Sequence, residues 1–205
     1  AMSTQTEHID LHQWESTDPF LCEDFNEDNR KIDAAVGELM ETQALIPLMT
    51  AEITEQVTAV EFNLSQIDLT QYCELQLKTT GLGTVNVTVL CATFNDDRTD
   101  GHYTYDTEGM AGGSYTGRAI ELSRVSKSEY YCGWKASFYL SERGILAESY
   151  SSYLNGAGNQ ISVERRFGAT TVSASLGAGT VRKLTLTATY YDLMSGTFYL
   201  YGVKR

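Results

Sequence analysis

Five side chains in the second half of this sequence have the types and spacing of a ligand-binding surface. They are Tyr131, Lys135, Tyr139, Tyr199 and Tyr201. The first three would point outward from one expected strand and the last two from another, because alternate strand residues face the same side. Tyrosine offers a wide, stiff ring and a hydroxyl, which suits sugars and protein partners alike. The pattern predicts a binding surface, although tyrosine is also favoured in strands for packing alone.

Catalytic chemistry has weaker support. A hydrolytic triad needs a histidine near its nucleophile, and the second half of the chain holds only His102. His8 and His12 are too few and too loosely spaced for a zinc site. No glycine-rich phosphate loop connects a strand to a helix. We therefore expect no catalytic residue, metal or cofactor. A glycosidase that uses two carboxylates stays open as an alternative, because such carboxylates need only meet in space.

The acidic loop Asn95 to Gly101, NDDRTDG, superficially resembles a calcium-binding loop. Counting back from Gly101 places Arg98 where an EF-hand needs an acidic or amide ligand, and Thr107 where it needs a bidentate glutamate. A solvated hairpin loop is the preferred interpretation. A calcium site of another kind stays open.

The four cysteines are Cys22, Cys73, Cys91 and Cys132, and they lack any CxxC or Cys/His metal spacing. The last three fall in phase with apolar neighbours on expected strands. This phase predicts buried free thiols, because cysteine commonly packs as a small apolar residue. A disulfide is the alternative.

The negative charge lies in the first segment. The chain of 205 residues has a net charge of −12, of which residues 1–58 contribute −11 and residues 59–205 contribute −1. This distribution argues against nucleic acid as a partner, since neither segment would attract a phosphate backbone. No apolar run approaches the roughly 20 residues of a membrane helix, and no signal peptide is recognisable, so we expect synthesis in the cytoplasm without membrane insertion.

Residues 59–205 have the pattern of a β domain. All 13 tyrosines and 16 of the 17 glycines lie there. About ten short segments alternate apolar and polar residues between glycine-rich turns, and residues 181–205 are expected to close the domain as a hairpin. The pattern predicts a mainly β fold: an antiparallel β-sandwich, jelly-roll-like, preceded by one N-terminal α-helix.

The N-terminal segment is expected to form an extended lead-in over residues 1–22, a helix over 23–46 and a linker over 47–58. An apolar stripe recurs along the helix, and Pro47 should end it. The stripe must bury itself, either on the β domain or in a short bundle with copies of the chain, for which a trimer is favoured. The residues expected in attachment or oligomerisation are Trp14, Phe25, Ile32, Val36, Leu39 and Ile46.

The stretch from Asp10 to Val36, DLHQWESTDPFLCEDFNEDNRKIDAAV, resembles the opening of small phage and prophage tail-region structural proteins of Gram-positive bacteria. In that group a series of QWE, TD, DFN, DN and KID pieces precedes a β domain. The ending SGTFYLYGVKR is similar to the ending common in such proteins. Cys22 departs from the pattern, in which a basic residue is commoner.

The resemblance implies a virion component with an N-terminal attachment segment and a displayed β module. We accordingly expect a non-enzymatic virion structural protein, associated with a phage tail or fibre. Its partners would be phage tail or fibre proteins, and its β domain would bind a host-surface glycan or another tail subunit. The alternatives are a carbohydrate-binding, lectin-like module and a glycan-degrading enzyme.

Overall fold

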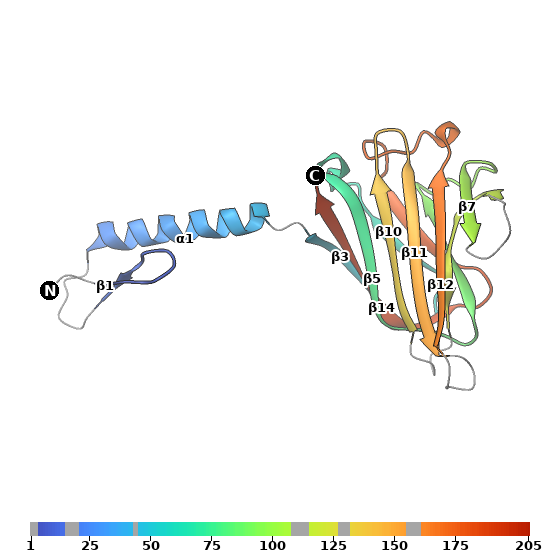
Figure 1. The fold of residues 1–205 in the computed structure, drawn as a ribbon, viewed down its shortest axis with the longest axis horizontal. Helices are drawn as coiled ribbons and strands as arrows, with labels where there is room; N and C mark the ends of the chain where they lie inside the picture. Colours follow the sequence, from blue (N-terminus) through green and yellow to red (C-terminus); the bar gives the residue numbers. More distant parts are fainter. Residues whose placement is uncertain (1–3, 15–20, 43–44, 108–114, 127–131, 155–160) are drawn as a thin grey trace. The chain divides into compact units, whose positions relative to one another are not determined.

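The chain divides into two compact units, Ala1–Ala44 and Leu45–Arg205. The structure, a computed structural model, describes residues 4–14, 21–42, 45–107, 115–126, 132–154 and 161–205 (Figure 1). The second unit begins 14 residues before Ala59, the first residue of the β domain expected from composition.

The first unit is a short hairpin and a helix. Strands β1 (Thr4–Gln5) and β2 (His12–Gln13) pair antiparallel, and α1 spans Cys22–Thr42. Glu23 and Asp24 lie in the first helical turn, where the helix dipole favours negative charge. The predicted helix is confirmed, but its predicted end at Ile46 is wrong. The residue before a proline is biased toward an extended backbone, and Ile46 precedes Pro47 in a strand.

Residues 47–58 were expected to be a linker, and most of them instead form strand β3 (Leu45–Ile53). This strand pairs with β14 (Leu193–Lys204) from Leu45 opposite Val203 to Ile53 opposite Gly196. It is an edge strand, which is where a sheet tolerates proline. The second unit therefore includes residues that the sequence pattern assigned to the linker.

Two antiparallel sheets make up the second unit, which confirms the predicted β-sandwich (Figure 1). The larger sheet has the order β3, β14, β5 (Tyr72–Thr84), β10 (Cys132–Leu140), β11 (Ile145–Leu154), β12 (Ile161–Thr170), β7 (Tyr103–Thr107) and β8 (Tyr115–Gly117). The smaller sheet has the order β4 (Ala59–Asn63), β13 (Lys183–Ala188), β6 (Thr88–Phe94) and β9 (Ile120–Val125). Two short 3₁₀ helices, Leu69–Gln71 and Val172–Ala174, lie in the connections.

The core between the sheets is built from strand residues that alternate inward. On β10 these are Trp134, Ala136, Phe138 and Leu140, all buried as the sequence predicted. Phe138 meets Phe94 of the smaller sheet edge-on, with ring centroids 5.6 Å apart. Aromatic pairs in this geometry stabilise a core beyond their buried area. Because alternate residues of a strand face opposite sides, the remaining side chains of β10 point away from the core.

A buried arginine joins the two sheets at β9 and β12. The Arg166 side chain is only 5% exposed, and its guanidinium bonds Glu121 of β9 at 2.6 Å and Glu164 of β12 at 2.7 Å. The backbone N–H of Arg124 also donates to the Glu164 carboxylate at 3.0 Å. Charged hydrogen bonds of this kind are strong, so they hold the edge of the smaller sheet against the larger one.

Three expectations about the β unit are wrong. Strands β13 and β14 do not form a closing hairpin, because they belong to different sheets. Cys91 is only partly buried, since the core-facing residues of β6 are its neighbours Leu90 and Ala92. Cys73 is exposed because it lies at the start of β5, outside the buried part of that strand. Cys73 and Cys91 are free thiols, and the Cys132 side chain lies outside the described residues.

Candidate binding face on the larger sheet

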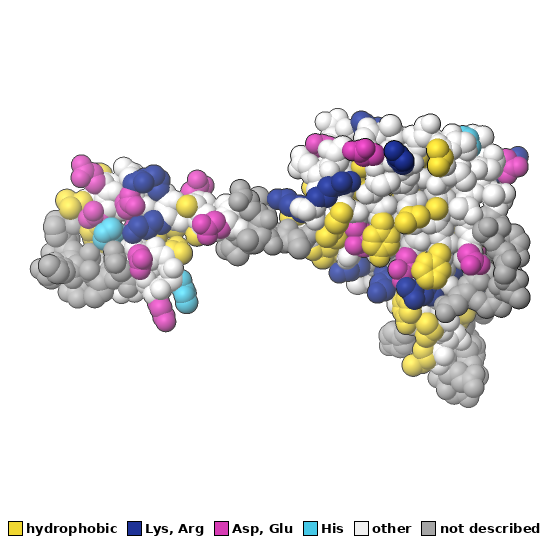
Figure 2. Space-filling view, turned by 45° about the horizontal axis from the view of Figure 1, so that its top comes forward, with side chains coloured by type: hydrophobic (Ala, Val, Ile, Leu, Met, Phe, Trp, Pro, Cys, Tyr) yellow, Lys and Arg dark blue, Asp and Glu magenta, His cyan; other side chains and the backbone are white. Residues whose placement is uncertain are grey.

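The side of the larger sheet that points away from the core is here called the outer face. Strand register places its side chains in rows that run across five strands. One row contains Tyr199, Lys78, Lys135, Tyr150 and Arg165, and the next contains Tyr201, Gln76, Ser137, Glu148 and Phe167. Figure 2 shows apolar and charged side chains gathered together on this side of the sandwich.

Each of three cations on the outer face lies over an aromatic ring. The distance from the cation to the ring centroid is 5.3 Å for Lys78 and Tyr201, 5.5 Å for Lys135 and Tyr150, and 4.7 Å for Arg165 and Phe167. Such contacts are attractive because the ring face is electron-rich. They hold flat rings and positive charges side by side on a solvent-exposed surface.

Lys78 and Lys135 lie directly opposite each other on β5 and β10. Like charges in this position destabilise a sheet. Neither ammonium group forms an ion pair with any carboxylate in the described part of the chain. The two neighbouring lysines therefore favour a polar or anionic group of a ligand at the centre of the outer face.

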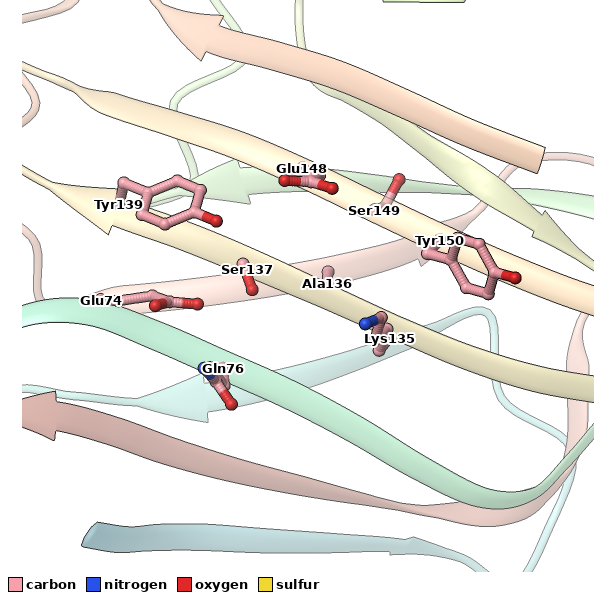
Figure 3. A pocket seen from close by; sticks show the side chains of 9 residues that line it. All are labelled: Glu74, Gln76, Lys135, Ala136, Ser137, Tyr139, Glu148, Ser149 and Tyr150. Atoms are coloured by element: carbon pink, nitrogen blue, oxygen red, sulfur yellow. The ribbon is translucent and has the colours of Figure 1, made fainter. Parts of the chain in front are cut away.

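A pocket of about 220 Å³ opens beside this pair (Figure 3). Glu74 of β5 and Glu148 of β11 lie on either side of β10, with Ser137 and Tyr139 between them. Desolvation and the neighbouring charges of Glu74 and Glu148 raise the pKa of Tyr139. The phenol therefore stays neutral and acts as a hydrogen-bonding group at physiological pH.

Four of the five predicted binding residues share the outer face. Lys135, Tyr139, Tyr199 and Tyr201 all point away from the core, while Phe198 and Leu200 are fully buried. Tyr131 lies outside the described residues.

Other residues of the outer face were not predicted from the sequence. They are Lys78, Gln76, Glu74, Glu148, Tyr150, Arg165 and Phe167. Alternation along each strand could have placed them on a solvent face. Their cross-strand partners depend on strand order and register, which no local pattern provides.

Beside the pocket, the outer face becomes apolar. Leu146 of β11 is 62% exposed, and Val163 of β12 is 58% exposed. Phe167 is also exposed and lies next to Glu148 on the neighbouring strand. Exposed apolar side chains that adjoin polar ones mark interaction surfaces.

The predicted attachment residues are divided between the two units. Phe25, Ile32 and Val36 lie on α1 with exposed side chains. The Trp14 ring lies 5.6 Å from the ring of His12, and the side chain of Leu39 is outside the described part. Ile46 lies on β3, so it is not part of the helical stripe.

The lead-in is bonded to the helix through one carboxylate. Asp28 accepts hydrogen bonds from the His12 backbone N–H at 3.1 Å and from the His12 ring Nδ1 at 2.9 Å. Burial opposes ionisation, but these bonds outweigh it and lower the pKa of Asp28. The Lys31 ammonium also donates to the Asp10 carbonyl at 2.6 Å.

Two carboxylates of the loop Asn95 to Gly101 pair with other groups of the protein. Asp96 pairs with Lys183 at 3.0 Å, and Asp97 with the His102 ring at 2.6 Å. The Asn95 side chain accepts the backbone N–H groups of Arg182 and Lys183. Among the described residues, no three His, Cys, Asp or Glu side chains gather where they could hold a metal ion.

The sequence matches no protein-family model and no curated protein. Within the described ranges, no helix has the length and apolar character needed to cross a membrane.

Proposed function

We propose that the protein is a non-enzymatic virion structural protein of a phage or prophage, associated with the tail or fibre, whose sandwich binds a host-surface glycan. The N-terminal resemblance supports the virion assignment, and the outer face supports glycan binding. Several residues of the resemblance lie in the first unit, where Asp28 and Lys31 bond the lead-in to α1. That unit would serve as the attachment segment.

The row of rings and cations beside the 220 Å³ pocket is the observation that carries the proposal. Flat rings can stack on the apolar faces of sugars, while the neighbouring Lys, Gln, Ser and Glu groups can bond sugar hydroxyls. The pocket is smaller than the roughly 300 to 1,000 Å³ typical of drug-sized ligands. It would hold one sugar unit, and flanking rings would contact the adjacent units of the chain.

Binding of the full-length protein to a bacterial-surface glycan array, followed by calorimetry, tests this function. Tyr139→Ala and Lys135→Ala should each weaken binding by about tenfold or more, because each removes a side chain that lines the pocket. Tyr190→Ala is the matched control, since Tyr190 is 71% exposed outside the pocket. All three variants should keep the melting temperature of the wild type. Binding that survives both pocket variants, or an array without any bound glycan, would refute the glycan assignment.

Glycan hydrolysis is a second candidate because Glu74 and Glu148 line one pocket. From strand and residue spacing, their Cα atoms lie roughly 12 Å apart, which allows the carboxylates to approach the 6.5 to 9.5 Å of inverting glycosidases. Glu148 already pairs with Arg165 at 2.8 Å, which favours a structural role for this carboxylate. The glycans recovered from the binding experiment decide between the two functions. Cleaved products that disappear with Glu74→Gln or Glu148→Gln would establish an enzyme.

A further inference from the structure

A second pocket, of about 380 Å³, lies on the smaller sheet. Cys91 and Thr93 of β6 line it beside Thr187 of β13, which is the cross-strand neighbour of Cys91. Arg98, from the loop after β6, and Arg118, from the segment before β9, complete the lining. We call this site the arginine pocket. None of its residues belongs to the outer face described above.

The two arginines of this pocket have no partner elsewhere in the described part of the chain. Neither Arg98 nor Arg118 forms an ion pair or a side-chain hydrogen bond there. By contrast, Arg165 and Arg166 are each paired with a glutamate. The chain as a whole carries a net charge of −12, so two unpaired guanidinium groups at one pocket are a local positive exception. The planar guanidinium is well suited to carboxylate and phosphate groups.

Two hydroxyl groups in the same pocket are also unsatisfied. The Oγ1 atoms of Thr93 and Thr187 are buried and form no hydrogen bond within the described residues. Thr93 as a whole is only 3% exposed. A buried hydroxyl without a partner destabilises a fold. These two hydroxyl groups lie beside two guanidinium groups, and they would donate hydrogen bonds to the oxygen atoms of a ligand.

Nothing in the immediate lining opposes a negative ligand. Burial raises the pKa of Cys91, so its thiol stays neutral at physiological pH, and it lies 3.3 Å from the Thr189 hydroxyl. Glu121, opposite Cys91 on β9, is already bonded to Arg166 at 2.6 Å. Ala119, Ala188 and the threonine methyl groups give the pocket an apolar wall.

We propose that the arginine pocket binds a small organic anion through its carboxylate or phosphate group. The volume lies within the range of small-molecule sites. The apolar wall favours a ligand with a carbon skeleton, such as a sugar acid or a polyol phosphate, over a bare inorganic ion. This site is independent of the outer face, so either proposal can fail while the other holds.

Titration of the full-length protein with sodium glucuronate, glycerol phosphate and glucose tests the proposal, with calorimetry and amide NMR shifts as the readouts. Glucuronate or glycerol phosphate should bind and shift the amides of Thr93 and Thr187, whereas glucose, the uncharged match, should not. Arg98→Ala and Arg118→Ala should each weaken binding by about tenfold or more. Arg143→Ala, which removes an exposed arginine outside the pocket, should leave binding unchanged.

Thr93→Val separates ligand recognition from folding. The substitution keeps the shape of the side chain and removes the unsatisfied hydroxyl, so the melting temperature should stay equal or rise while affinity falls. Binding of only one of the two anions supports the proposal and identifies the group that is recognised. The proposal is overturned if neither anion binds in the millimolar range, if glucose binds equally well, or if binding survives both arginine substitutions.

Discussion

Asp97 shows how single residues stabilise the loop that follows β6. Its carboxylate accepts hydrogen bonds from the His102 ring and from the Thr99 backbone N–H, and its own carbonyl accepts one from the Tyr103 hydroxyl. Desolvation by itself would raise the pKa of Asp97, but the bonds from His102 and Thr99 outweigh it and lower that pKa below its ordinary value of 3.8. The ionised form is therefore favoured by folding.

A lowered pKa means that this stabilisation is present above about pH 4 and is lost as the pH falls through the folded-state value. Asp97→Asn should lower the melting temperature at pH 7, and the difference from wild type should shrink as the pH drops below about 4. Thermal unfolding monitored by circular dichroism across this range measures the difference. Asp100→Asn, in the same exposed loop, should show little difference at any pH. A gap between Asp97→Asn and wild type that is as large at pH 2 as at pH 7 would contradict the assignment.

At the scale of elements, the contact of β9 with β12 depends on the absence of a side chain at residue 168. A Cβ atom added to Gly168 would lie 2.3 Å from Cγ2 of Ile120, which is fully buried, and 3.0 Å from the Thr104 carbonyl oxygen. Gly168→Ala should therefore force the strands apart and lower the free energy of unfolding by about 1 to 3 kcal/mol.

Urea denaturation measures this change. Gly179→Ala serves as the control, because an added Cβ meets nothing within 4 Å there, and its effect should stay within about 0.5 kcal/mol. Equal stability of the two variants would show that the close approach of β9 and β12 is not required.

The elements that sequence could predict are those in which alternation is long and chemically clear. The Trp134 to Leu140 series placed four residues in the core and, by the same phase, Lys135 and Tyr139 outside it. Alternation was misleading on β6, where Val89, Leu90, Cys91 and Ala92 are consecutive apolar residues and fit either phase. Strand β3 was missed because a proline such as Pro47 usually marks the end of a helix or strand, although an edge strand accepts it.

The residues of the outer face were predicted only in part for a different reason. Each strand pattern indicates which residues point outward, but it does not indicate which strands are neighbours. Strand order brings Tyr150 beside Lys135 and Glu148 beside Ser137 through long-range pairing. The arginine pocket is a stronger example, since Arg98 and Thr187 are far apart in sequence and come together only when β13 pairs with β6.

At the scale of the whole molecule, the helix and the sandwich would combine into a multivalent binder. A single pocket of 220 Å³ would give limited affinity, and joining several copies raises apparent affinity by roughly 10² to 10⁴ when their geometry permits simultaneous binding. The exposed side chains of Ile32 and Val36 on α1 provide an apolar surface for such association. With 21 residues, α1 is long enough for only about three heptads, so the oligomer should be weak.

Full-length protein at high concentration should therefore have a mass above that of the monomer by light scattering, with a trimer as the expected species. Residues 45–205, which keep β3 and the complete core, should be monomeric. Cutting at residue 59 instead would remove β3 and expose the backbone edge of β14 to aggregation, so it is the wrong comparison.

Substitution within the full chain locates the association on α1. The double change Ile32→Asp and Val36→Asp should reduce the mass to that of the monomer, because burial of charge on the apolar stripe is unfavourable. Ala34→Asp, about 200° around the helix from Ile32, adds charge on the opposite face and should leave the mass unchanged. Helical content from circular dichroism should be similar in both variants. Equal masses for the full chain and residues 45–205 would refute helix-driven assembly, and each sandwich would then have to bind its ligand without the gain from multivalency.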